Sequence, residues 1–447
     1  MTPVAAAWFA VPFFLLPGFL FNLIAGAKGP RALAAALPVS FGIFGMSAWV
    51  WGLTSAPLDL WTLGVSLVVA FGAAAVWRYA FARKARRGGA VTWRRALFPG
   101  DWRKGSLLDL YWLLPTAGVA VGAWLLISER LGWLVRSPHG VYNIVQGWDV
   151  QWHANLVRFI MDEGIASPTR LGELQNVETH AQLLYPSAFH TGIAMFGKVA
   201  GLDPIPTLNI GMIVLTGLAL PATAACMAFA FLRSRGLTAQ IAGGLAAILV
   251  TVAPQLIWVG DYVGMWPYLF AMSLTGMVIW QFVRVPAERI TALPALVGLL
   301  GVLTAHPAAV TVVVIGVGLY WLTSTLVAPE RGRISDTLWL AAPGIIGAVL
   351  YLPQVFAGSA QAEEVSGWKP VESEDLDSGW AAAFTMGTRH VHQLFPGFDP
   401  TVLLWLAGLG AVALVVWRRQ VWAPLFYAIW LAIAANALAP VGGPLSG

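Results

Sequence analysis

The sequence predicts an all-α polytopic membrane protein with about twelve transmembrane helices. Its 447 residues are 58% hydrophobic and only 11% charged, and the mean hydropathy is +0.73. A soluble domain usually carries about 25% charged residues. Many apolar runs approach the roughly 20 residues that a helix needs to cross a bilayer core. Because backbone groups in lipid must pair within the chain, runs of this kind indicate helices rather than a barrel.

Charge between the apolar runs predicts how the chain is threaded. The segment RYAFARKARRGGAVTWRRALFPGDWRK (78–104) is densely basic and is expected to be cytoplasmic. Alternation from this loop places the N-terminus and residue 447 outside, and most of the 26 Lys and Arg residues inside. The net charge of +5 is therefore a topology signal and does not indicate a nucleic-acid partner. The predicted spans are 6–25, 32–53, 58–78, 107–127, 206–232, 237–258, 266–284, 290–305, 308–327, 335–356, 401–417 and 420–439.

Residues suited to chemistry fall on the predicted outer side. All seven histidines lie at or near the outer face, and the two long hydrophilic loops, 128–205 and 357–400, are also outside. Almost no charge falls within the predicted spans. We therefore expect any chemistry at the outer boundary of a plasma membrane.

The first outer loop contains GWDVQWHANLVRFIMDEG (147–164), which predicts a short interfacial helix. Asp149 would complement the helix dipole at the start, and Gly164 would end the helix. An apolar face is predicted, with Trp148 and Trp152 at headgroup depth. Asp149 and His153 are four residues apart and are expected to share a face. The alternative is structural: Asp149 caps the helix, and the other charges are solvated. The residues predicted for the apolar face are Trp152, Leu156, Phe159, Ile160 and Glu163.

A second short helix is predicted in LLYPSAFHTGIAMFGKVAG (183–201). Counting this stretch as a span would invert every later loop and violate the charge rule. We therefore expect an interfacial or re-entrant helix that begins near Pro186, with His190, a candidate substrate-binding residue, one turn in.

The order of these parts resembles the GT-C superfamily of lipid-dependent glycosyltransferases. The likeness lies in Asp149, in WHANLVRFIMDEG, in YPSAFHTGIAMF and in LTAHP (303–307). More narrowly, the first loop resembles actinobacterial envelope membrane proteins. The resemblance implies a GT-C-like transmembrane module over 106–440. It also implies a three-helix extension with a basic cytoplasmic loop over 1–105, and the start of a further C-terminal region at 441–447.

The resemblance also implies a reaction. A sugar would move from a polyprenyl-phosphate donor to a glycan or lipid acceptor of the cell envelope. Asp149 would be the catalytic base, with His153 orienting it or touching phosphate. Many GT-C enzymes carry two adjacent acids in this loop, whereas Asp149 stands alone. A requirement for a divalent cation, Mg or Mn, is therefore left open.

Further candidates have a structural and a functional interpretation. Arg158 is four residues from Asp162, which favours an ion pair over substrate binding. Asp261 is an isolated acid in a predicted outer turn and is either a helix cap, a second active-site acid or a metal ligand. His306 lies near lipid and is either functional or satisfied at a helix end. The segment TRHVHQLF adds Arg389, His390 and His392, for which phosphate contact is favoured over metal binding.

Two other function classes remain open. A lipid or polysaccharide transporter or flippase would place ionisable residues at mid-membrane. A non-catalytic envelope-assembly protein could keep the same fold without activity. In all three interpretations the lipid bilayer is a partner and nucleic acid is not.

Overall fold

The computed structural model is a helical bundle, and the described part of the chain contains no strand. The structure describes residues 1–54, 56–87, 112–145, 147–174, 184–357, 376–385, 391 and 394–438. Its helices are α1 (Pro3–Ile24), α2 (Gly29–Ala34), α3 (Ala36–Leu53), α4 (Leu60–Arg87), α6 (Leu113–Arg136), α7 (Val150–Glu163), α8 (Ala188–Ala200), α9 (Pro204–Leu232), α10 (Leu237–Leu249), α11 (Trp258–Val263), α12 (Trp266–Phe282), α13 (Ala292–Ala305), α14 (Val310–Tyr320), α15 (Arg333–Ala357), α17 (Leu376–Thr385), α19 (Thr401–Arg418) and α20 (Trp422–Leu438).

The chain is an all-α membrane protein. Each of the twelve predicted spans contains a helix, and among the described residues eight helices are long and apolar enough to cross a bilayer. The other four predicted spans correspond to α10, α12, α13 and α20, which are 13 to 17 residues long. Their crossing of the membrane stays a prediction.

One predicted span is displaced along the chain. The range 107–127 was expected to cross, but α6 begins at Leu113 and continues to Arg136. The loop that was predicted to begin at residue 128 therefore starts later in the chain. The displacement moves Arg130 from the loop into the helix, where it is 4% exposed. The expectation that the spans are almost free of charge is corrected at this residue.

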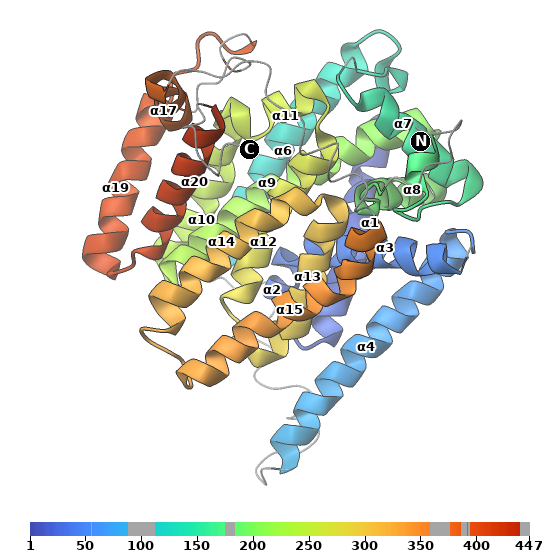
Figure 1. Cartoon of the computed structure of the whole chain (residues 1–447). Helices are drawn as coiled ribbons and strands as arrows, with labels where there is room; N and C mark the ends of the chain where they lie inside the picture. The colour runs from blue at the N-terminus through green and yellow to red at the C-terminus, as the bar shows by residue number, and fades with distance from the viewer. Residues whose placement is uncertain are drawn as a thin grey trace.

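Helix α9 lies at the centre of the bundle. It packs against α1, α6, α7, α8, α10 and α12. The N-terminal helices are part of the same core, since α1 packs on α3 and α9 and both contribute buried residues to the main hydrophobic cluster. By contrast, α4 projects away from the bundle along much of its length (Figure 1).

Small residues bring α3 and α13 into close contact. Among the helices that the structure describes, these two form the most extensive pair. A Cβ atom on Gly301 would lie 2.0 Å from the carbonyl oxygen of Pro38, and one on Gly42 would lie 2.0 Å from that of Val297. Glycine is therefore required at both positions. Without a hydrophobic driving force between helices in lipid, such close approach is a main source of packing energy.

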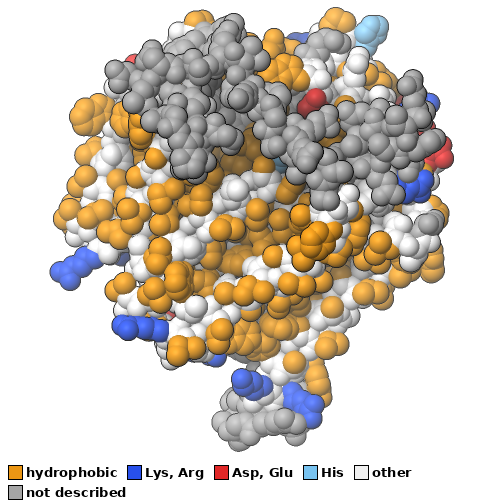
Figure 2. Space-filling view, in the orientation of Figure 1, with side chains coloured by type: hydrophobic (Ala, Val, Ile, Leu, Met, Phe, Trp, Pro, Cys, Tyr) orange, Lys and Arg blue, Asp and Glu red, His pale blue; other side chains and the backbone are white. Residues whose placement is uncertain are grey.

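The charged loops separate onto two ends of the bundle. Arg31 pairs with Glu288 at 2.6 Å, Arg233 pairs with Glu330 at 3.3 Å, and Arg78 donates to the carbonyl of Leu23. These contacts gather the predicted inner loops at one end, which we call the basic end. In Figure 2, Lys and Arg side chains lie along this lower end, below a surface that is mostly apolar. Helices α7, α8 and α11 lie toward the opposite end (Figure 1).

Replacement of Gly301 by alanine tests the contact between α3 and α13. The added methyl would meet backbone, so the helices must separate, and we expect a loss of about 1–3 kcal/mol in the free energy of unfolding. Gly318→Ala in α14 is the matched control, since nothing lies within 4 Å of its Cβ position. Thermal unfolding of the purified protein in detergent measures both. Equal melting temperatures would contradict the packing.

Candidate functional site

Helix α7 begins where the sequence predicted. Asp149 is its N-cap residue, and Gly164 ends it in the left-handed conformation, with a φ of 68°. The Asp149 side chain makes no capping hydrogen bond. Asp149 and Trp148 are both exposed. The structure therefore does not support the alternative in which the Asp149 carboxylate caps the helix.

The buried face of α7 differs from the prediction. Its buried residues include His153, Leu156 and Ile160, whereas Trp152 and Phe159 are only partly buried and Glu163 is exposed. His153 is 1% exposed. Asp149 is the N-cap residue one helical turn before His153, and it is exposed whereas His153 is buried, so the two side chains lie in different environments.

His153 and His190 form a buried pair between α7 and α8. Nε2 of His153 lies 3.1 Å from the carbonyl oxygen of Gly264, and Nδ1 lies 3.0 Å from Nε2 of His190. A carbonyl can only accept, so Nε2 of His153 carries the proton and donates it. Nδ1 of His153 then accepts from the Nε2–H of His190. His153 therefore carries a single proton, on Nε2, and His190 carries a proton on its own Nε2.

The surroundings keep both histidines neutral. Burial lowers the pKa of His153 to about 4, and burial followed by the neighbouring His153 lowers the pKa of His190 well below its ordinary value. A neutral, buried histidine is poorly suited to binding phosphate. The pair instead positions α7 against α8 and the turn at Gly264.

Helix α8 is buried within the protein. Residues 188–197 are all buried, and the helix packs on α3, α7 and α9. Its N-cap is Ser187, one residue after the predicted start. Of the two expected placements, lying flat in the interface does not fit a helix whose first ten residues are all buried in the protein.

The surface around Asp149 includes Tyr185 and Trp152. Their rings make an edge contact with centroids 5.6 Å apart. Burial, followed by the negative charge of Asp149, raises the pKa of Tyr185. Partial burial also raises the pKa of Asp149 above its usual range. Asp149 is thus a more basic carboxylate than one in open water, held beside a protonated phenol.

Asp261 is not isolated, as the sequence suggested, but forms a bidentate ion pair with Arg130. Nε of Arg130 donates to one carboxylate oxygen at 2.8 Å, and Nη2 donates to the other at 2.7 Å. Nη1 also donates to the hydroxyl of Thr216 and to the carbonyl of Ile213 in α9. The pair therefore ties α6, α9 and α11 together.

A cavity of about 390 Å³ opens beside this ion pair. Arg130 and Asp261 are its charged centre, and Glu129 adds an exposed carboxylate. Its walls are largely aromatic and apolar, with Asn209 as a further polar group. The remaining lining residues are Trp133, Leu134, Val145, Met212, Ile213, Trp258, Tyr262, Trp266, Leu394 and Phe395.

The turn at Val263–Gly264 joins the start of α7 to this cavity. The amide of Trp148 donates to the carbonyl of Val263 at 2.8 Å. Gly264 has a φ of +83°, and a Cβ there would lie 2.8 Å from the Val150 side chain. Only glycine is compatible with both conditions. Asp149 does not line the cavity, but its backbone is held against the turn that precedes the lining residue Trp266.

The remaining predicted site residues do not lie with Asp149 or line the cavity beside Arg130 and Asp261. Arg158 is exposed and pairs with Asp162 at 3.2 Å, which confirms the predicted structural role. His306 ends α13 and makes an edge contact with Tyr268. Arg389, His390 and His392 lie outside the described residues. Among the residues that are described, no group of three or more His, Cys, Asp or Glu side chains could hold a metal ion.

The sequence reasoning missed Arg130, Glu129 and the aromatic lining. A signal was present, since Glu129 and Arg130 interrupt an otherwise apolar stretch. Charge in a membrane helix is costly and usually faces the bundle interior. Placing the span too early assigned both residues to a loop and hid that signal.

The neutral histidine pair predicts a pH dependence of stability. Histidine in the unfolded chain titrates near 6.5, whereas His153 in the fold titrates near 4. Between these values the unfolded chain binds more protons, so stability falls as the pH is lowered from about 6.5 to 4. His153 alone contributes at most about 1.4 kcal/mol per pH unit. Thermal unfolding at several pH values measures this pH dependence of stability. A slope that is unchanged in His153→Gln would contradict its assignment to His153.

The Arg130–Asp261 pair predicts an asymmetric mutational effect. Arg130→Met leaves the Asp261 carboxylate without its partner, at a cost of about 3–5 kcal/mol in the free energy of unfolding. The double variant Arg130→Met with Asp261→Asn removes the unpaired charge and should recover part of this loss. Denaturation of both variants is the measurement. If the single and double variants lose equal stability, the unpaired Asp261 carboxylate is not the cause of the loss.

The comparisons with known proteins give one match. The family of unknown function DUF6541 matches residues 11–447. No curated protein and no solved structure matches the chain.

Proposed function

Because the chain belongs to the DUF6541 family, whose function is not known, we propose its function from the site. We propose that it is a membrane glycosyltransferase of the GT-C kind. It would transfer a sugar from a polyprenyl-phosphate donor to a cell-envelope glycan or lipid at the outer face of the plasma membrane. The observation that carries the proposal is Asp149, an exposed carboxylate of raised pKa that follows Trp148, whose amide is hydrogen-bonded to the turn before the cavity-lining Trp266.

Asp149 has the properties of a general base. Its carboxylate is not engaged in capping the helix, although the backbone that carries it is fixed by the turn at Gly264. Glycosyl transfer needs a base that takes the acceptor hydroxyl's proton while the anomeric carbon is attacked. A base of raised pKa performs this transfer more effectively at neutral pH.

The cavity has features suited to a lipid-linked sugar. Aromatic side chains such as Trp133 and Tyr262 offer flat apolar faces to a sugar ring, and Asn209 and Glu129 offer hydrogen-bond partners. The hydrogen bonds of Arg130 are directed at Asp261 and α9, so this residue shapes the cavity more than it could hold a phosphate.

We propose that the last predicted outer loop, 357–400, binds the phosphate of the donor. Arg389, His390 and His392 precede Leu394 and Phe395 closely in the chain. Leu394 and Phe395 line the cavity. Arg389 would bind phosphate through its guanidinium group.

Asp149→Asn tests the proposal. The amide cannot accept the proton, so we expect sugar transfer from a purified polyprenyl-phosphate donor to fall about 10²–10⁴-fold. Asp162→Asn makes the same change at an exposed acid of the same helix and should have little effect. The wild-type rate should fall with decreasing pH as Asp149 becomes protonated, at a higher pH than for an aspartate in water. Full activity of Asp149→Asn would contradict the mechanism.

A non-catalytic role in envelope assembly is a second candidate, favoured by one observation. Asp149 is absent from the residues that line the cavity. The aromatic cavity would then bind a lipid or glycan without catalysing its reaction. Retention of a lipid-linked sugar by the wild type, with no turnover under any acceptor condition, would favour this candidate.

Transport is favoured by a different observation. Arg130 is a buried charge within a membrane helix, and the chain leaves helical conformation near Ala253, after α10. Broken helices and interior charge are common in transporters. Movement of a lipid-linked sugar across proteoliposomes without sugar transfer would support transport over catalysis.

A further inference from the structure

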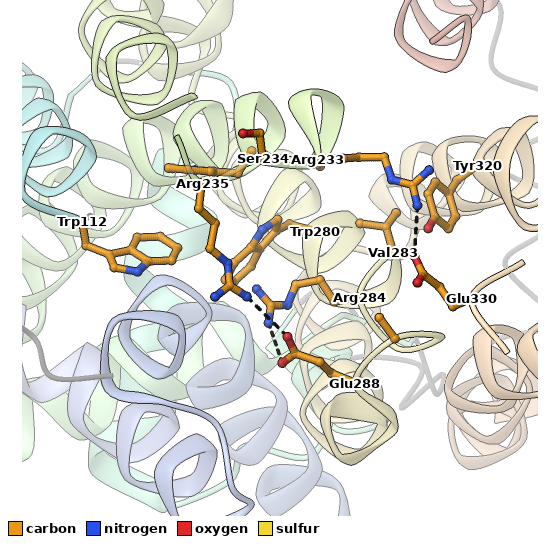
Figure 3. A pocket seen from close by; sticks show the side chains of 13 residues that line it. Trp112, Arg233, Ser234, Arg235, Trp280, Val283, Arg284, Glu288, Tyr320 and Glu330 are labelled. Carbon is orange, nitrogen blue, oxygen red and sulfur yellow. Dashed lines mark hydrogen bonds and ion pairs between the residues drawn. The ribbon is translucent and has the colours of Figure 1, made fainter. Parts of the chain in front are cut away.

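A second pocket lies at the basic end of the bundle, away from the candidate site. Its volume is about 220 Å³. It is lined by the end of α9, the end of α12 and the turns that follow these two helices, together with Trp112, Tyr320 and Glu330. In Figure 3, Arg235 and Arg284 point toward Glu288, and Arg233 points toward Glu330 beside Tyr320. The polar part of this pocket is therefore rich in guanidinium groups.

Three arginines and two glutamates, Glu288 and Glu330, line this pocket, and Arg31 reaches Glu288 from outside it. Glu288 accepts from Arg284 at 2.7 Å and from Arg31 at 2.6 Å, and lies 3.5 Å from Arg235. Three guanidinium groups thus share one carboxylate. The side chains of Arg31 and Arg284 are only 10% and 17% exposed, so water compensates their charge poorly. An additional anion would complete the pairing.

An apolar cavity adjoins this charged pocket. Trp112, Phe229 and Trp280 line both spaces. The second cavity measures about 310 Å³ and runs along α1, α2, α6, α9 and α12, with Ala222 and Cys226 in its wall. A guanidinium cluster at one end and an apolar chamber at the other match the two parts of a phospholipid.

We propose that an anionic phospholipid occupies both spaces, with its phosphate at Arg233, Arg235 and Arg284 and one acyl chain beside Ala222. Arginine recognises phosphate through paired hydrogen bonds. A free phosphate or other soluble anion would use only the charged pocket and leave the apolar chamber empty. By the positive-inside rule the lipid comes from the cytoplasmic leaflet, where basic pockets between helices bind anionic headgroups. This site is independent of the proposed glycosyl transfer.

Native mass spectrometry of the full chain, purified from nanodiscs of phosphatidylglycerol or phosphatidylcholine, tests the proposal. The wild type should retain phosphatidylglycerol preferentially. The double variant Arg233→Gln with Arg235→Gln should lower that retention about tenfold or more, since two charge-assisted contacts are lost. Arg333→Gln, an exposed arginine at the start of α15 and outside the pocket, is the matched control and should retain lipid as the wild type does.

A second variant tests whether the apolar cavity holds the acyl chain. Ala222→Phe fills the chamber while leaving every arginine in place, so it should also lower phosphatidylglycerol retention. Thermal unfolding with added phosphatidylglycerol or inorganic phosphate gives a second readout, in which only the lipid should stabilise the wild type. Two results would overturn the proposal. One is equal retention in the arginine double variant and the wild type, and the other is stabilisation by inorganic phosphate that Ala222→Phe leaves unchanged.

Discussion

The turn at Val263–Gly264 is the constraint on which the candidate site depends. It accepts a hydrogen bond from the amide of Trp148 through Val263, and another from His153 through Gly264. Its positive φ lets the chain reverse between α11 and α12 in contact with Val150. On one side the turn leads to Asp261, which pairs with Arg130, and on the other side to Trp266, which lines the cavity. One short turn thus fixes the start of α7 and part of the cavity wall together.

Two features let a largely apolar chain build a polar site of this kind. Close packing at small residues, as between α3 and α13, gives the bundle a rigid frame without polar groups. The charged side chains that enter the frame are paired and hydrogen-bonded, as Arg130 and Asp261 are. Asp149 lies outside this frame, and its carboxylate is exposed and takes no part in capping.

The sequence predicted the helical class, the positions of most helices and the grouping of the basic loops, because apolar run length and charge asymmetry are local signals. It also predicted α7, its end at Gly164 and the pair between Arg158 and Asp162, which depend on neighbours within one or two turns. It did not predict the pairing of Arg130 with Asp261, which are 131 residues apart. Nor did it predict that His153 turns inward onto His190, because a periodic face does not reveal which partner covers it. The twelve crossings, the GT-C relationship and the reaction stay predictions.

The central claim is that Asp149 acts on a lipid-linked sugar held near the cavity. Mass spectrometry of the lipids that co-purify with the protein tests it most directly, with the wild type and Asp149→Asn compared under the same conditions. If Asp149 is the base, the variant should accumulate an intact polyprenyl-phosphate sugar, and the wild type should carry less of it because transfer consumes it. Identical lipid profiles in the two proteins, without any polyprenyl-phosphate sugar, would contradict the claim.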